Sequence, residues 1–147
     1  MRTLSAVMLP AILLVTACGG GSGSGGGQDT AACEITGPSH FTVTGGGSLN
    51  TTAAYTIENT GTVPLTLNQL PSTVVSTSGS GTISINGKLQ NPGVIGTVLQ
   101  AGDTTSANVL WAATCTSPVT AVIALTARQS SSLGAQTCSI NVQFGCT

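Results

Sequence analysis

The chain has 147 residues, enough for one domain of ordinary size, and a second domain is not expected. Only 5% of the residues are charged, against about 25% in ordinary soluble proteins, so hydroxyl and amide groups must keep the surface hydrated. Three Lys and Arg residues cannot form the basic patch that nucleic-acid binding requires, and this excludes nucleic acid as a partner.

The N-terminus has the layout of an export signal. Arg2 gives the first residues a positive charge, and an apolar run over residues 4–15 follows, interrupted once by Pro10. This run is shorter than the roughly 20 apolar residues that a membrane-spanning helix needs. Small residues at positions 16 and 17 then precede Cys18. The pattern predicts a cleaved signal peptide over residues 1–17.

The end of this segment resembles the lipobox of bacterial lipoproteins, and it reads Val15-Thr16-Ala17-Cys18. In that family the leader is cut just before the cysteine, whose sulfur carries a diacylglyceryl group. The resemblance implies that Cys18 is lipidated and anchors the protein in a membrane, since two buried acyl chains already hold a protein durably. We therefore expect a cell-envelope lipoprotein facing the periplasm or the cell exterior, and Gly19 favours the outer membrane in a Gram-negative host. Ordinary secretion with an unmodified Cys18 is the alternative.

A glycine-rich tether follows the expected lipid site. Residues 19–27 are all glycine or serine, and the stretch up to residue 32 adds no apolar periodicity. Such composition is typical of a flexible coil, and fourteen residues would reach about 20 Å. We therefore divide the mature chain into a lipidated cysteine with a flexible linker, residues 18–32, and one domain, residues 33–147.

The domain has the pattern of a β-protein. Apolar and polar residues alternate with the period of half-buried strands over residues 53–57, 65–67, 119–125 and 140–144. Weaker strand patterns cover residues 73–76, 82–85 and 94–99. Turn residues separate these runs at positions 45–47, 59–61, 78–81, 86–87, 91–93 and 102–103. Seven to nine short strands with frequent turns predict an all-β sandwich or barrel.

Two of these turns resemble turns of the immunoglobulin-like domains found in bacterial envelope proteins. Residues 57–67 match the pattern N-x-G-x-x-P-L-x-L, with Asn59, Gly61 and Pro64 at its fixed positions. Residues 99–105 match a later L-x-x-G turn. The resemblance implies an immunoglobulin-like β-sandwich over the domain. It implies no activity, because such domains serve many proteins as spacers or binding modules.

Four cysteines remain once Cys18 is assigned to lipid, and an even number in an exported chain predicts two disulfides. One of the three possible pairings is excluded, because Cys138 and Cys146 lie about 26 Å apart on one extended strand. Of the other two, the immunoglobulin topology implies that Cys33 pairs with Cys138 and Cys115 with Cys146. Metal binding is disfavoured, since the chain has no C-x-x-C motif and one histidine, and no cofactor is expected.

Few residues could carry out catalysis. His40 would need a carboxylate to orient it, and the chain has no G-x-S-x-G nucleophile motif. A glycosidase would have to draw its two carboxylates from Glu34, Glu58 and Asp103. We interpret these carboxylates as solvated charges at strand ends and His40 as an ordinary surface or strand residue. The sequence therefore predicts no catalytic residues.

By exclusion, the leading hypothesis is a non-enzymatic envelope module that binds a protein or glycan partner or acts as a structural element. Aromatic platforms for sugar rings are scarce, and Trp111 lies in an alternating run that indicates a core residue. The alternative is a subunit of a surface or periplasmic assembly that pairs through a strand edge, because few charges would guard the sheet edges. A small hydrolase is the least favoured hypothesis.

Overall fold

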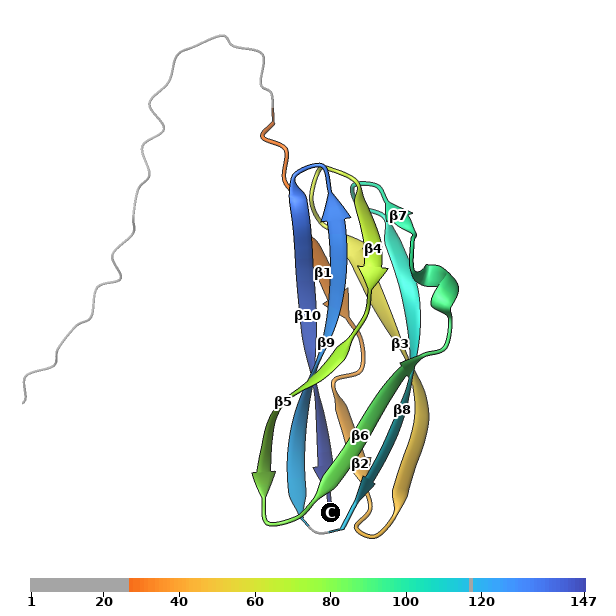
Figure 1. Cartoon of the computed structure of the whole chain (residues 1–147), viewed down its shortest axis with the longest axis vertical. Helices are drawn as coiled ribbons and strands as arrows, with labels where there is room; N and C mark the ends of the chain where they lie inside the picture. Colours follow the sequence, from red (N-terminus) through yellow and green to blue (C-terminus); the bar gives the residue numbers. More distant parts are fainter. Residues whose placement is uncertain (1–26, 117) are drawn as a thin grey trace, which may run out of the picture.

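The computed structural model describes residues 27–116 and 118–147 (Figure 1). The expected signal peptide, the lipid site at Cys18 and the tether up to residue 26 lie outside the described residues. No helix among the described residues is long and apolar enough to cross a membrane. The described residues form ten strands and one short 3-10 helix: β1 (Cys33–Thr36), β2 (His40–Val43), β3 (Ser48–Asn59), β4 (Leu65–Gln69), β5 (Ser72–Gly79), β6 (Ile83–Leu89), η1 (Pro92–Val94), β7 (Val98–Leu99), β8 (Thr104–Cys115), β9 (Val119–Ser131) and β10 (Gly134–Cys146).

The strands form two sheets packed face to face (Figure 1). Sheet A has the order β1-β3-β8-β6, and sheet B has the order β2-β10-β9-β4-β7, with β5 also paired to β9. All strand pairs are antiparallel except β2 and β10, which run parallel. This is the A-B-E-D and G-F-C arrangement of immunoglobulin domains, with β4 and β5 in place of strand C. The structure therefore confirms the expected immunoglobulin-like β-sandwich.

The strand count agrees with the expected range once β4 and β5 are considered together. β4 pairs with the stretch of β9 around Gln129, and β5 pairs with the preceding part of β9, from Leu125 back to Val119. The two segments are therefore successive halves of one interrupted strand. Counted in this way, the domain has nine strands, at the upper end of the expected seven to nine.

Alternation along the strands builds the core between the sheets. In β3, the side chains of Ala53, Tyr55 and Ile57 face inward and are buried, while their neighbours point outward. The same pattern runs through β8 and β9. The four clearest strand predictions, residues 53–57, 65–67, 119–125 and 140–144, fall in β3, β4, β9 and β10 and are confirmed.

The aromatic side chains of the domain meet in one cluster between the sheets. Trp111 is fully buried, as expected for a core residue, and its indole N–H donates to the Tyr55 hydroxyl over 2.9 Å. That hydroxyl in turn donates to the Pro38 carbonyl over 3.0 Å. The Trp111 and Phe144 rings meet edge to face with centroids 5.3 Å apart, and Phe41 stacks on Phe144. The cluster therefore joins β3 and β8 of sheet A to β2 and β10 of sheet B.

Two disulfides also connect the sheets. Cys33 on β1 is bonded to Cys138 on β10, with α-carbons 5.7 Å apart. Cys115 at the end of β8 is bonded to Cys146 at the end of β10, with α-carbons 6.1 Å apart. These are the pairs that the immunoglobulin topology implied. Each disulfide ties a strand of sheet A to β10 of sheet B, and such bonds typically stabilise a fold by about 2 to 5 kcal/mol.

A single buried amide holds the two turns that resembled immunoglobulin motifs. The side-chain nitrogen of Asn59 donates to the carbonyls of Val63 and Leu99, over 2.8 and 2.9 Å. Its side-chain oxygen accepts the Gly61 N–H, and its backbone carbonyl accepts the Gly102 N–H. Asn59 is fully buried. The first turn is therefore closed on itself and bound to the second by one residue.

The chain before β1 is also bound to this corner. Residues 60–63 donate four backbone hydrogen bonds to the carbonyls of Thr30 and Ala32. Gly61 permits this approach, because a Cβ at that position would overlap the Thr30 carbonyl oxygen. The contacts of the domain thus begin three residues before the expected boundary at residue 33.

The predicted turn at Asn86-Gly87 was wrong, because both residues lie inside β6. Gly87 is in register with Trp111 on β8, and a Cβ on Gly87 would collide with the Trp111 ring. The glycine is therefore needed for close packing against the indole, not for a change of chain direction. The neighbouring strand prediction at residues 82–85 corresponds to the start of β6.

The strand predicted over residues 94–99 was also largely wrong. The strand there is limited to Val98–Leu99, and η1 precedes it. The Val94 N–H donates to the Asn91 carbonyl and the Thr97 N–H to the Val94 carbonyl. These local bonds hold the start of the segment in consecutive turns, and regular pairing with β4 is limited to Val98 and Leu99.

We predict that Asn59→Ala lowers the free energy of unfolding by about 3 kcal/mol, because three buried backbone groups lose their partner. Asn59→Asp should also destabilise, since a carboxylate cannot donate to the two carbonyls. Urea denaturation of the purified protein measures both effects. Asn141→Ala, which removes an exposed amide from β10, is the control and should change the stability by less than about 0.5 kcal/mol. An unchanged urea midpoint for Asn59→Ala would contradict the role given to this amide.

A second prediction concerns alkaline pH. Burial raises the pKa of Tyr55 above 10.0, with the hydrogen bond from Trp111 acting in the opposite direction. Because the folded protein retains this proton more tightly than the unfolded chain, the stabilisation is complete below about pH 10 and decreases as the pH rises further. Tyr55 is the single tyrosine of the chain, so Tyr55→Phe should reduce the alkaline loss of stability. Urea midpoints across this pH range test it, and equal slopes in both proteins would refute it.

Candidate functional site

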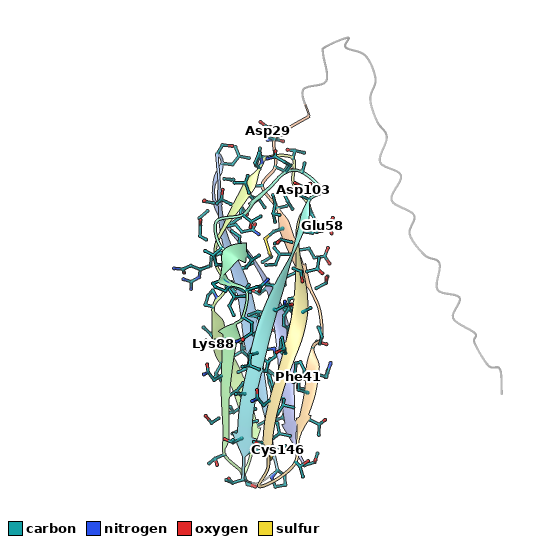
Figure 2. The ribbon with its side chains drawn as sticks, turned by 90° about the vertical axis from the view of Figure 1, so that its right-hand side faces the viewer. Asp29, Phe41, Glu58, Lys88, Asp103 and Cys146 are labelled. Carbon is teal, nitrogen blue, oxygen red and sulfur yellow. A yellow bond between two sulfur atoms is a disulfide. The ribbon has the colours of Figure 1, made fainter. Side chains whose placement is uncertain are left out.

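The carboxylates of the domain lie at the pole where the described chain begins. Asp29, Glu58 and Asp103 gather there in Figure 2, and Glu34 is in register with Glu58 across β1 and β3. Glu34 is exposed, and its side chain points outward from sheet A. The Asp103 carboxylate accepts the Gln100 N–H over 2.9 Å and so closes the turn before β8. The carboxylates thus occupy an outer sheet face and a turn.

His40 lies far from this acidic pole. It is an exposed residue of β2, in register with Gln143 near the end of β10, whereas Cys138, which is bonded to Cys33, lies five residues earlier. Five residues of extended strand correspond to about 17 Å. The His40 ring nitrogen Nδ1 instead shares a hydrogen bond with the Ser39 hydroxyl over 2.9 Å. His40 is therefore a surface strand residue, as expected, and no carboxylate is placed to orient it.

The distance between His40 and the carboxylates at the acidic pole also matters for metal binding. Among the described residues, no group of three or more His, Cys, Asp and Glu side chains is arranged to hold a metal ion. All four cysteines of the domain are engaged in disulfides. The acidic pole therefore offers no evident coordination site.

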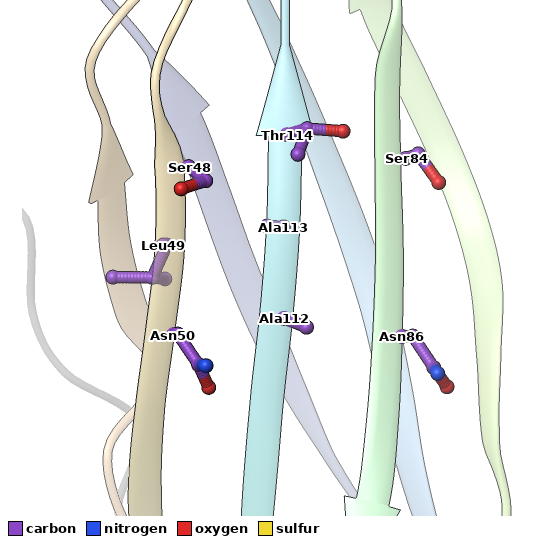
Figure 3. A pocket seen from close by; sticks show the side chains of 8 residues that line it. All are labelled: Ser48, Leu49, Asn50, Ser84, Asn86, Ala112, Ala113 and Thr114. Carbon is purple, nitrogen blue, oxygen red and sulfur yellow. The ribbon is translucent and has the colours of Figure 1, made fainter.

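The described surface does carry a shallow hollow, of about 300 Å³, on the outer face of sheet A (Figure 3). It spans three neighbouring strands, β3, β8 and β6. Two rows of residues in cross-strand register form it, one of hydroxyls and one in which Ala112 lies between two asparagines. Because the alanine side chain is much shorter than that of asparagine, the surface is lower over β8 than over β3 and β6 on either side. The lining residues are Ser48, Leu49, Asn50, Ser84, Asn86, Ala112, Ala113 and Thr114.

The hollow is uncharged, and its lining combines polar side chains with the apolar Leu49, Ala112 and Ala113. The Asn50 and Asn86 side chains project on both sides of Ala112 (Figure 3), and each amide offers donors and an acceptor. Ser48, Ser84 and Thr114 add hydroxyl groups that can donate or accept. No ionisable side chain lines the hollow. The arrangement can hydrogen-bond a neutral ligand that carries hydroxyl or amide groups, and it has no group to activate a nucleophile.

Sequence reasoning did not identify these residues as a site. They come from three strands that are distant in the sequence, and serine, threonine and asparagine in such a pattern carry no motif. One signal was available, because Ser48, Asn50 and Thr52 are polar at every second position of a strand and therefore share its outer face. The pairing of β3, β8 and β6, which brings the two asparagines to either side of Ala112, could not be read from that signal.

No protein-family model and no curated protein sequence matches the chain. Among solved structures, the chain is similar to the VesB protease of Vibrio cholerae, with 13% identity and a TM-score of 0.45 over 76% of this chain and 31% of VesB. The secreted serine protease VesC of Vibrio cholerae is 18% identical, with a TM-score of 0.38 over 77% of this chain and 23% of VesC. PapD-like domain 7 of human CEP192 is 12% identical, with a TM-score of 0.39 over 78% of this chain and 83% of that domain. The chain thus spans about a third of VesB and a quarter of VesC, and similarities this distant assign neither a family nor an activity.

Proposed function

We propose that this protein is a lipid-anchored component of the bacterial cell envelope whose immunoglobulin-like domain binds a partner without catalysing a reaction. The observation that carries the binding role is the hollow on sheet A, which presents amides and hydroxyls beside small apolar side chains and no ionisable group. The two disulfides support a location outside the cytoplasm, because such bonds persist in oxidising compartments. The lipobox-like leader supports the anchor.

The position of the hollow suits presentation away from a membrane. The chain enters the domain beside Asn59, which is in register with Cys33 at the start of β1. Asn50, on the edge of the hollow, lies nine residues away along the same strand, or about 30 Å. An anchor attached through the N-terminus would therefore leave the hollow at the far half of the domain.

The partner that fits this surface is neutral and carries hydroxyl or amide groups. A glycan chain and a polar protein loop both have this chemistry, and both can hydrogen-bond with asparagine and serine side chains. The acidic pole does not contribute to the hollow, so recognition should depend weakly on salt.

The anchor is tested by metabolic labelling with radioactive palmitate in the native host or a bacterial expression strain. The wild-type protein should incorporate the label and sediment with membranes. Cys18→Ala should lose the label and leave the membrane fraction, because no other side chain of the lipobox-like segment can accept a diacylglyceryl group. An unlabelled wild-type protein, or labelled Cys18→Ala protein, would refute the anchor.

The binding surface is tested with the double variant Asn50→Ala and Asn86→Ala of the full chain. Binding to immobilised envelope glycans and to envelope proteins should weaken about tenfold, because two neutral hydrogen bonds of about 0.5 to 1.5 kcal/mol each are lost. Asn141→Ala, an exposed amide on sheet B, is the matched control and should bind normally. Equal binding by the double variant and the wild type would rule out the hollow as the recognition site.

A further inference from the structure

One asparagine at the rim of the hollow is followed by glycine. Asn86 and Gly87 form the single Asn-Gly pair of the chain, because the other six asparagines precede threonine, glutamine, proline or valine. The backbone nitrogen of the next residue can attack an asparagine side chain, and glycine hinders that attack least because it has no Cβ and its backbone turns freely. The pair therefore has the sequence of a site for spontaneous deamidation.

The packing of the core keeps glycine at this position. Gly87 is in register with Trp111 on β8, and a Cβ on Gly87 would lie 2.5 Å from the indole carbon Cζ3. Trp111 is fully buried and packs against Tyr55 and Phe144, so its ring is held in place. The fold thus requires the residue that makes the neighbouring asparagine labile.

The attacking nitrogen lies on an open edge of sheet A. β6 is the last strand of this sheet and pairs with β8 alone. In antiparallel strands, residue pairs that exchange backbone hydrogen bonds alternate with pairs that do not. Beyond one end of β6, the Gln90 N–H donates to the Asn108 carbonyl, and beyond the other, the Thr116 N–H donates to the Thr82 carbonyl. The register between these pairs is continuous, so Gly87 falls in the non-bonded set and its N–H points away from β8.

The group under attack is accessible as well. The exposed Asn86 side chain stands on the outer face of sheet A (Figure 3). Extended backbone directs the Gly87 nitrogen away from this side chain, so a ring between them closes only when β6 locally leaves β8. A seven-residue strand that is paired on one side opens more readily than a central strand. Local opening of β6 therefore sets the rate of attack.

We propose that Asn86 is a modification site, at which the side-chain amide becomes a carboxylate without an enzyme. The Gly87 nitrogen loses its proton and bonds to the Asn86 side-chain carbon Cγ, and the amide group leaves as ammonia. Water then opens the cyclic imide at either carbonyl, which gives aspartate or its β-linked isomer. Neither an oxidant nor a cofactor takes part. The product places a negative charge at the rim of a hollow that has no ionisable lining residue.

Both products change the hollow. An aspartate side chain has no N–H to donate, and the β-linked isomer adds a methylene group to the backbone of β6 where it pairs with Ala112. Binding of a neutral partner should weaken in the converted protein. This consequence rests on the proposed function, whereas the modification itself does not.

The test incubates the full-length protein in detergent from neutral to mildly alkaline pH and follows each asparagine by peptide mass spectrometry. Asn86 should lose its amide and gain an oxygen-18 atom from labelled water, faster as the pH rises because the Gly87 nitrogen must be deprotonated. Asn50 is the internal control, since it is exposed in the same row of sheet A but precedes Thr51, and it should keep its amide. The readout needs no binding partner, so it is independent of the proposed function.

The same protein unfolded in urea gives the reference rate, because the Asn86-Gly87 pair is then free of β8. Asn86 should convert faster in urea than in the folded protein, and faster than Asn50 in both. Asn86→Gln should abolish the change, since the longer side chain would have to close a larger ring. A folded protein in which Asn86 keeps its amide as long as Asn50 does, while it converts in urea, would overturn the proposal.

Discussion

The buried amide of Asn59 is the interaction on which the corner of this sandwich depends. One side chain satisfies the Val63 and Leu99 carbonyls and the Gly61 N–H, so two turns that are forty residues apart have a common centre. A buried polar group stabilises a fold when all its hydrogen bonds are made and destabilises it when they are not. Asn59 meets this condition, and the segment before β1 and the turn before β8 are both bonded to this corner.

β10 has a corresponding role in joining the sheets. Both disulfides end on this strand, and Phe144 brings it into the aromatic cluster with Trp111 and Phe41. An ordinary immunoglobulin domain of antibodies joins its sheets with one disulfide through the middle of the core. Here one bond ends at the last residue of β10 and the other eight residues earlier, and the buried Val142 and Phe144 lie between them. The middle strand of the hollow, β8, is therefore joined to sheet B by the Cys115–Cys146 bond and by the contact of Trp111 with Phe144.

Much of the fold followed from local patterns, whereas the site did not. Alternation predicted β3, β4, β9 and β10, because a strand with one buried face must repeat every two residues. Asn86-Gly87 was misread because a close-packed glycine and a turn glycine are identical in sequence, and only the Trp111 ring opposite distinguishes them. The hollow arises from cross-strand neighbours, which one sequence without its strand pairing does not reveal. The sequence likewise did not indicate that Gln129 is buried, with a side-chain amide that has no protein partner among the described residues.

The bond between Cys33 and Cys138 has a mechanical consequence for a domain held by its N-terminus. A pull on the preceding segment first loads the hydrogen bonds of Thr30 and Ala32 to the neighbouring turn, which can break and re-form. The force then reaches Cys33 and crosses directly to β10, because the disulfide is covalent. β1 is therefore not peeled from the edge of sheet A one hydrogen bond at a time, and the load passes to a strand held on both sides by β2 and β9.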